Sequence, residues 1–264
     1  MRWMGEYPSS LQPLRIGGGT IERGEGGFVR LALPTLGRRY ADAQVDDTAG
    51  LPRARFRHRP PFRFHLRARA SHAQPIGTLG FGLWNDPFAL SVGLAGAARK
   101  LPAPPQALWF FYGSPPNDMA YAAPGVPCGW KAASLCSPHL PGAMVAAGGL
   151  GLMALGVLRR WQAGAVRWAL SYVAASEARI DVDLADWHTY DLVWADSKAD
   201  FLLDGELLLR VDRPPDPPLG FVAWIDNQYA VISRDKGVKF GVLPVPEPQW
   251  LELADLHLEG SASR

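Results

Sequence analysis

The feature that most constrains the fold is a strict alternation in residues 62–70 (FRFHLRARA), where apolar and basic side chains take turns. The apolar positions are Phe62, Phe64, Leu66, Ala68 and Ala70, and the basic positions are Arg63, His65, Arg67 and Arg69. Successive side chains of a β-strand point to opposite faces of its sheet. The pattern therefore predicts a strand with one face in a hydrophobic core and the other in water, as in an antiparallel sheet.

The arginines of this segment raise the question of nucleic acid, because basic stripes bind phosphate. Arg53, Arg55, Arg57 and Arg59 continue the odd-numbered pattern upstream. The formal net charge of the chain is only +2, however, and the strand alternation already explains the spacing. We therefore predict a solvated sheet face and no nucleic-acid partner.

Most of the remaining chain also has the pattern of short strands separated by turns rich in glycine and proline. About ten to twelve such segments are present, without the strand–helix–strand rhythm of a parallel sheet. Residues 107–112 (ALWFFY) are apolar at every position, which predicts a central strand covered on both faces. Residues 40–50 (YADAQVDDTAG) are more polar and predict a loop or a short edge strand.

These patterns predict an all-β fold built as an antiparallel β-sandwich. The chain has 264 residues, and β-sandwiches of about 200–250 residues commonly form one domain, so we expect residues 1–264 to be a single domain. One helical segment is expected as an insertion at about residues 142–176, which are rich in alanine and poor in β-branched side chains.

Three features bear on the compartment and on membranes. Residues 142–158 carry no charge but are too short and too rich in glycine for a spanning helix, so we predict no transmembrane span. The N-terminus lacks the apolar core of a signal peptide, which favours the cytoplasm. Cys128 and Cys136 could close a short disulfide loop, but two reduced thiols are the expectation for a cytoplasmic protein.

Several segments resemble strands of a known family. Residues 187–194 (WHTYDLVW), followed by residues 201–206 (FLLDGE), resemble a pair of strands in the laminarinase-like glycoside hydrolases of family 16. Upstream, FRFHLRARAS and GTLGFGLWND resemble two further strands of that family. The resemblance implies the concanavalin A-like jelly roll of the lectin and glucanase superfamily.

The resemblance does not extend to the family's catalytic residues. In the family, E-x-D-x-x-E or E-x-D-x-E lies on the strand after the one that GTLGFGLWND resembles, and the alternation points these carboxylates into one cleft. Here that strand is Ala107 to Tyr112, which has no carboxylate. Because a fold does not by itself carry a function, the family 16 mechanism is not expected in this chain.

Three segments carry more polar and aromatic side chains than packing requires, and we expect them to converge on a concave-face cleft. Carboxylates and amides hydrogen-bond sugar hydroxyls, while aromatic rings stack on the apolar face of a sugar. The alternative is that the Asn-Asp pairs form turns and that the tryptophans belong to the core. The candidate ligand-binding residues are Trp84, Asn85, Asp86, Tyr112, Asn117, Asp118, Trp224, Asp226, Asn227 and Tyr229.

Two further groups are weaker candidates. His188 shares its strand parity with Tyr190 and could act as an acid or base, although in the resembled family this position is structural. Asp181, Asp183 and Asp186 alternate in part and could bind calcium, with a solvated strand face as the alternative. No other metal or cofactor is expected.

The sequence leaves three functions open. The leading hypothesis is a carbohydrate-binding, lectin-like protein whose partner is a small saccharide or glycan. The second is a glycoside hydrolase or lyase with a relocated acid/base pair, Asp86 or Asp118 together with Asp226. The third is a structural or interaction module whose inserted helical segment contacts a partner or a membrane surface.

Overall fold

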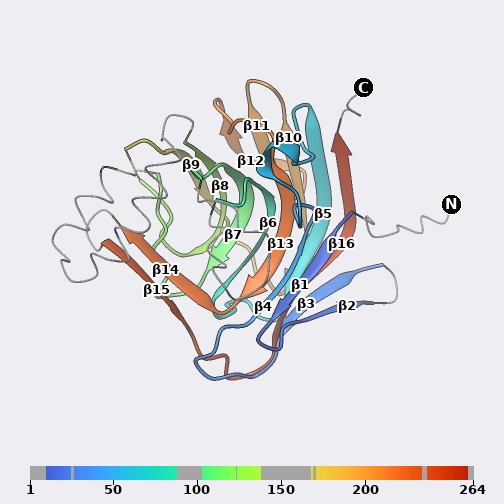
Figure 1. The fold of residues 1–264 in the computed structure, drawn as a ribbon, viewed down its shortest axis with the longest axis vertical. Coiled ribbons are helices and arrows are strands. Elements are labelled where there is room, and N and C mark those ends of the chain that lie inside the picture. The colour runs from blue at the N-terminus through green and yellow to red at the C-terminus, as the bar shows by residue number, and fades with distance from the viewer. Residues whose placement is uncertain are drawn as a thin grey trace.

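The computed structural model describes residues 10–24, 27–87, 103–122, 124–137, 168, 171–233 and 237–260. These residues form two seven-stranded antiparallel sheets and a separate two-stranded hairpin (Figure 1). The two large sheets pack face to face, so the predicted antiparallel β-sandwich is confirmed.

The sheets combine strands that are distant in sequence. The first sheet has the order β1 (Gln12–Ile16), β4 (Asp42–Asp46), β13 (Gly220–Asp226), β6 (Thr78–Trp84), β7 (Ala107–Gly113), β8 (Gly129–Cys136) and β9 (Ala174–Arg179). The second has the order β12 (Glu206–Val211), β11 (Ala199–Leu203), β10 (His188–Trp194), β5 (Phe62–Ala70), β16 (Gln249–Gly260), β3 (Val29–Leu33) and β2 (Thr20–Arg23). The hairpin consists of β14 (Gln228–Ser233) and β15 (Gly237–Val242), and the 3-10 turn η1 spans Arg53–Arg55.

The main core lies between the two sheets and is rich in aromatic rings. Tyr190 of β10 lies with its ring centroid 5.0 Å from that of Phe81 in β6 and 5.0 Å from that of Phe110 in β7. Its hydroxyl accepts a hydrogen bond of 3.3 Å from the indole of Trp130 in β8. Phe64 of β5 packs edge-on against Phe81 and Phe110. These contacts join the centres of the two sheets.

The alternating segment behaves as its sequence predicts. In β5 the apolar residues are buried, and the basic ones are half-buried or exposed on the outer face of the second sheet. Carboxylates neutralise this face: Arg63 pairs with Asp191 at 2.6 Å and Arg69 with Glu252 at 2.7 Å. The prediction of a solvated sheet face is therefore confirmed for β5, whereas Arg53 and Arg55 belong to η1 and do not extend the strand.

Residues 107–112 form a central strand, as predicted. β7 lies between β6 and β8, and all of its residues are buried. The predicted hairpin at Asp204-Gly205 is also confirmed, since these two residues join β11 to β12 with φ values of 51° and 87°. Positive φ at both positions is the geometry that favours Asp-Gly in two-residue turns.

Three expectations need correction. Residues 42–46 form β4, which is neither a loop nor an edge strand because it pairs with both β1 and β13. Sixteen strands are present among the described residues, more than the ten to twelve expected, because several predicted segments fold back on themselves. Residues 174–176 of the predicted helical insertion belong to β9.

Most of that insertion, residues 142–167 and 169–170, lies outside the described residues, as does the uncharged stretch 142–158. Within the described residues, no inserted helical segment is seen and no helix has the length and hydrophobicity to cross a membrane. Cys128 and Cys136 are free thiols, as expected. Cys128 directly precedes the extended strand β8 and Cys136 is its last residue, so they lie roughly 25 Å apart, which precludes a disulfide.

The connection between β7 and β8 folds back against the outer face of the first sheet, where a buried ion pair anchors it. Lys131 of β8 is 1% exposed, and its ammonium group donates to Glu177 of β9 at 2.7 Å. It also donates to the carbonyl oxygens of Met119 at 2.6 Å and Val126 at 2.8 Å. Glu177 in turn accepts a hydrogen bond from the Val126 amide at 2.9 Å.

Replacement of Lys131 by methionine should therefore lower the free energy of unfolding by about 3–5 kcal/mol, because Glu177 would be left buried without its counter-charge. Chemical denaturation would measure the change. Lys198→Met is the matched control, since Lys198 is exposed and its nearest carboxylate oxygen is 3.8 Å away. Equal effects of the two substitutions would contradict the anchoring role.

Candidate functional site

The outer face of the first sheet carries a second aromatic cluster, separate from the main core. Trp109 and Phe111 of β7, Trp224 of β13 and Trp84 of β6 form its centre. The rings of Trp84 and Trp224 are nearly parallel, at 7°, with centroids 6.5 Å apart. Trp109 lies 5.9 Å from Trp224 and 5.7 Å from Phe111.

Strand parity explains why these rings share one face. In β7, Leu108, Phe110 and Tyr112 point into the main core, so Trp109 and Phe111 must point outward. Gly80 of β6 makes room for the Trp224 ring: a Cβ atom there would lie 2.8 Å from Cη2 of that ring and 2.4 Å from the Phe110 carbonyl oxygen.

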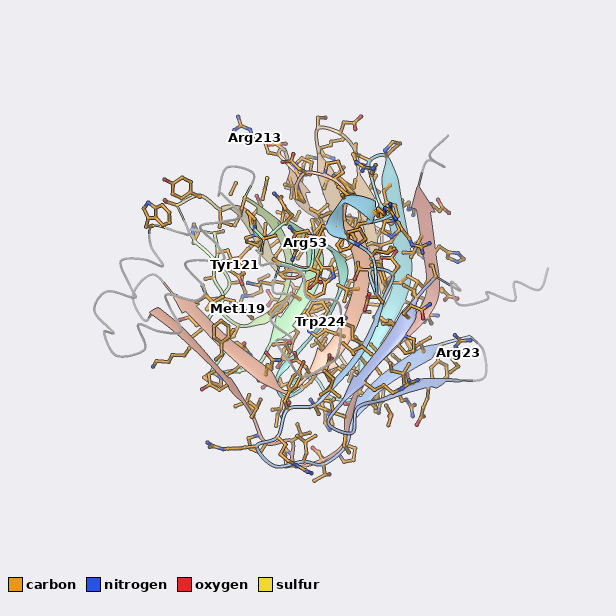
Figure 2. All side chains as sticks on the ribbon, in the orientation of Figure 1. Arg23, Arg53, Met119, Tyr121, Arg213 and Trp224 are labelled. Carbon is orange, nitrogen blue, oxygen red and sulfur yellow. The ribbon has the colours of Figure 1, made fainter. Side chains whose placement is uncertain are left out.

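Met119, Tyr121 and the hairpin cover part of this cluster. Met119 and Tyr121 come from the connection between β7 and β8, and Figure 2 shows them on the same side of the molecule as Trp224. Ala230 and Ile232 of β14 pack against the same rings. Trp84 is half-buried and remains the most accessible of the four central rings, because Trp109, Phe111 and Trp224 are all buried.

A row of polar groups begins directly beside Trp224. The Trp224 indole donates to Thr78 Oγ1 at 3.0 Å, and the Thr78 hydroxyl donates to Asp226 Oδ1 at 2.8 Å. Asp42 of β4 pairs with Asp226 directly across the antiparallel ladder. Side chains at such opposed positions have Cβ atoms about 4.5–5.5 Å apart, so two carboxyl groups face each other in this row.

Ionising both of these carboxyl groups is unfavourable, because two negative charges would then face each other. Burial raises the pKa of Asp226 to about 6, and the hydrogen bonds from Thr78 and from the Gln228 amide limit the rise. Burial, followed by the nearby charge of Asp226, raises the pKa of Asp42 as well. Burial and the charge of Asp42 raise the pKa of Tyr40 in the same way. The two carboxyl groups therefore titrate as a coupled pair, with both pKa values above the ordinary value of an aspartate.

The sequence prediction missed Asp42, Tyr40 and Thr78. Residues 40–50 were expected to form a loop or an edge strand, so their side chains were not assigned to a face. The missed signal is the alternation of Asp42, Gln44 and Asp46, which all face outward in β4. Such a polar alternation on an internal strand indicates a sheet face that is used for something other than packing.

The structure brings together some of the predicted residues but not others. Trp84, Trp224 and Asp226 lie on the outer face of the first sheet. Asn85 is buried in a turn, where its amide donates to the Pro104 carbonyl oxygen at 2.8 Å. Asp86 has a φ of 50° in the same turn.

The register of β6 and β13 separates Asp86 from Asp226. Asp226 pairs with Thr78 at one end of the ladder, and Trp84 pairs with Gly220 at the other. The two ends are roughly 20 Å apart at the rise of a β-strand. Asp86 follows Trp84, so it does not form an acid/base pair with Asp226, and the carboxylate that faces Asp226 is Asp42.

The two predicted asparagines have structural partners. Asn117 donates to the Ser114 carbonyl oxygen at 2.7 Å and accepts from the Ala230 amide at 2.8 Å. Asn227 is fully buried; its Oδ1 accepts from the Ala41 amide at 2.9 Å, while its Nδ2 donates to the carbonyl oxygens of Arg39 at 2.9 Å and Leu243 at 2.7 Å.

Asp118 and Tyr229 lie at the hairpin. The backbone of Asp118 bonds β14 through the amide of Ile232, at 2.8 Å, and the carbonyl oxygen of Ala230, at 2.9 Å. Tyr229 pairs with Gly241 across the hairpin, and its ring occupies the space that a Gly241 side chain would fill. Both residues are half-buried.

Tyr112 and His188 do not reach the outer face of the first sheet. Tyr112 belongs to the main core, where burial raises its pKa to about 12. His188 lies in the second sheet, and its Nδ1 is 2.7 Å from Asp204 Oδ2. His188 is therefore held by a neighbour within its own sheet and is not brought to Asp226.

The three aspartates considered for calcium are exposed. Asp183 Oδ1 accepts a hydrogen bond of 2.9 Å from the Ala185 amide, as in an Asx turn. In the described part of the chain, no group of three or more His, Cys, Asp or Glu side chains is arranged to hold a metal ion. Calcium binding stays a prediction.

The outer face of the second sheet differs from that of the first because arginine side chains stack on its aromatic rings. The Trp187 ring centroid lies 5.1 Å from the guanidinium carbon of Arg67 and 4.9 Å from that of Arg69. Trp250 lies 5.3 Å from Arg69 and 4.9 Å from Arg30. These cation–π contacts form a continuous ladder and reduce the ring surface left for a ligand.

The raised pKa of Asp226 predicts how stability depends on pH. Between about pH 4 and pH 6 the folded protein keeps a proton on Asp226 that the unfolded chain releases, so the free energy of unfolding falls as pH rises through this window. Asp226→Asn should remove on the order of 3 kcal/mol of this decline, measured by denaturation between pH 4 and pH 7.5.

Asp200→Asn is the control with the opposite sign. A hydrogen bond from Arg210 lowers the pKa of Asp200, so the charged form stabilises the fold at neutral pH and this stability is lost on acidification. If Asp226→Asn left the pH profile unchanged, Asp226 would not carry the proton assigned to it.

Asn227→Ala should lower the free energy of unfolding by about 3 kcal/mol, because it leaves buried backbone groups at Ala41, Arg39 and Leu243 without partners. Its neighbour Gln228 is half-buried, so Gln228→Ala should cost far less. Thermal denaturation of both variants would compare them, and the reverse order would contradict the structural role of Asn227.

No known protein family matches the sequence, and no curated protein matches it either. Solved structures do match. A pseudo β-1,3-glucanase of Mycobacterium tuberculosis is 13% identical, with 97% of this chain and 94% of that chain covered and a TM-score of 0.50. A legume lectin-like domain from Entamoeba histolytica is 8% identical, covering 96% and 90%, with a TM-score of 0.48.

A β-glucanase of Bacillus licheniformis is 10% identical over 97% of this chain and 95% of that chain, with a TM-score of 0.47. At these identities the likeness concerns the fold alone, and of these three structures the mycobacterial one, with its TM-score of 0.50, supports it. The strand order, the two packed sheets and this likeness agree with the resemblance seen in the sequence. By its fold, the chain is an antiparallel β-sandwich of the concanavalin A-like type.

Proposed function

We propose that this protein binds a saccharide on the outer face of its first sheet, beside Trp84 and Trp224. The observation that carries the proposal is the second aromatic cluster, which adjoins the polar row of Thr78, Asp226 and Asp42. Sugar sites combine these two elements, since rings pack on C–H surfaces while carboxylates and hydroxyls bond the sugar hydroxyl groups.

The contrast between the two sheets supports this choice of face. The indoles of the second sheet are packed against guanidinium groups, and its carboxylates Asp191 and Glu252 are paired with arginine. Trp84 is half-buried without a cation–π partner among the described residues. Its indole Nε1 is buried without a hydrogen-bond partner in the described structure, and so is that of Trp109. Buried donors without a partner are uncommon in folded proteins, and they are compatible with a role in ligand binding.

A second candidate is hydrolysis of a glycosidic bond by Asp226 and Asp42. The specific observation is that the two carboxyl groups face each other with raised pKa values. A protonated carboxylic acid can protonate a leaving oxygen, and retaining glycosidases hold their two carboxyl groups about 5–5.5 Å apart. This pair would replace the combination of Asp226 with Asp86 or Asp118 that the sequence suggested.

The binding proposal is tested with a glycan array and with titration calorimetry on the saccharides that the array identifies. Trp84→Ala should weaken binding at least tenfold, because it removes a ring at the accessible edge of the site. Trp187→Ala is the matched control: Trp187 is also a half-buried tryptophan, but it lies on the opposite sheet.

Thermal denaturation would establish that both variants are folded. The proposal is wrong if the intact protein binds no saccharide, or if the two variants lose affinity equally. Release of reducing ends from a bound oligosaccharide, abolished by Asp226→Asn, would establish the hydrolase instead of simple binding.

A further inference from the structure

The outward-facing strand positions of the first sheet have an uneven distribution of charge. Asp42 and Asp46 of β4 and Asp226 of β13 lie on the side of Trp224. The basic residues at outward positions, Lys131 and Arg179, lie on β8 and β9 at the other side of the sheet. Within the described strands, the neighbourhood of Trp224 is therefore acidic and has no basic side chain.

Lys131 cannot serve a ligand from where it lies. An ammonium group has three N–H donors, and those of Lys131 bond Glu177, the Met119 carbonyl oxygen and the Val126 carbonyl oxygen. The nearest buried cation on this face is thus fully used by the protein. A ligand carboxylate or sulfate would find no free positive charge among the described residues of β4, β13, β6, β7 and β8.

Two buried polar atoms on the same face lack partners. Asp42 is 4% exposed, and its Oδ1 atom accepts no hydrogen bond within the described structure. Trp109 is 5% exposed, and its Nε1 atom donates none there. A buried polar group without a partner destabilises the fold, and a ligand hydroxyl that reached either atom would relieve this cost. A hydroxyl group both donates and accepts, so it suits the carboxyl oxygen and the indole N–H alike.

Resting on the proposed function above, we propose that this site takes uncharged saccharides and rejects those that carry carboxylate or sulfate groups. The physical basis is repulsion. A like charge brought within a few ångströms of Asp42 and Asp226 costs energy, and the described residues of β4, β13, β6, β7 and β8 supply no free cation that returns it. A neutral sugar avoids this cost. The selectivity thus depends on the repulsion of charged saccharides as well as on the binding of neutral ones.

The test compares saccharides that differ only in charge. Laminari-, cello- and manno-hexaoses would be titrated against their C6-oxidised counterparts, in which uronate carboxylates replace the primary hydroxyl groups. At pH 8, where Asp226 with its pKa of about 6 is ionised, we expect the neutral form of at least one backbone to bind at least tenfold more tightly than its uronate, which corresponds to about 1.4 kcal/mol. Added salt should narrow the ratio, because it screens the repulsion.

Variants connect this selectivity to the acidic pair. Asp226→Asn and Asp42→Asn should each bring the neutral-to-uronate ratio toward one, whereas Asp200→Asn on the second sheet should leave it unchanged. Should both site variants fail to fold, the salt dependence of the intact protein still measures the repulsion.

The possible outcomes separate the two proposals. The charge selectivity is wrong if uronates bind as tightly as the neutral forms. It is also wrong if neither Asp226→Asn nor salt changes the neutral-to-uronate affinity ratio. Either result would leave saccharide binding intact. Absence of binding by every neutral and oxidised hexaose, together with a negative glycan array, would overturn both.

Discussion

The structure depends on one constraint: the central strands of the first sheet are apolar on both faces. Phe110 and Tyr112 of β7 fill the core between the sheets, while Trp109 and Phe111 of the same strand point outward. A sandwich has only two sheets, so no third sheet covers these outward rings. The connection between β7 and β8 and the hairpin β14–β15 bury part of them instead, and Lys131 and Glu177 anchor that connection. The remaining accessible surface at Trp84 becomes the candidate site.

Two buried polar arrangements on this face have opposite characters. Lys131 and Glu177 neutralise each other and use their hydrogen-bonding capacity within the protein, as a structural pair must. Asp42 and Asp226 face each other as like charges, and burial raises the pKa of both. Such a pair weakens the fold at neutral pH instead of stabilising it. Carboxyl groups kept at a cost to stability, beside an aromatic surface, are typical of functional sites.

A fold does not by itself carry a function, so the β-sandwich leaves the choice between binding and catalysis open. In this chain the outward positions of β7 are Ala107, Trp109, Phe111 and Gly113, none of which can move a proton. The carboxyl groups lie two and three strands away from β7, on β13 and β4. The proposed site is therefore centred on different strands from the one that carries the catalytic residues in the resembled family.

The sequence by itself determined the elements whose pattern is local. Alternation identified β5, the uniformly apolar run identified β7, and Asp204-Gly205 identified a hairpin, because parity and turn geometry are properties of a few consecutive residues. Trp84, Trp224 and Asp226 were recognised as unusual in the same way. Only the tertiary structure decided which of these residues meet. In the structure, Asn227 is buried and bonds backbone groups, and Tyr112 lies in the core. Asp42 lies opposite Asp226 on a neighbouring strand, although the two residues are about 180 positions apart in the sequence. Strand pairing at that separation depends on the register of the whole sheet, which no local pattern encodes.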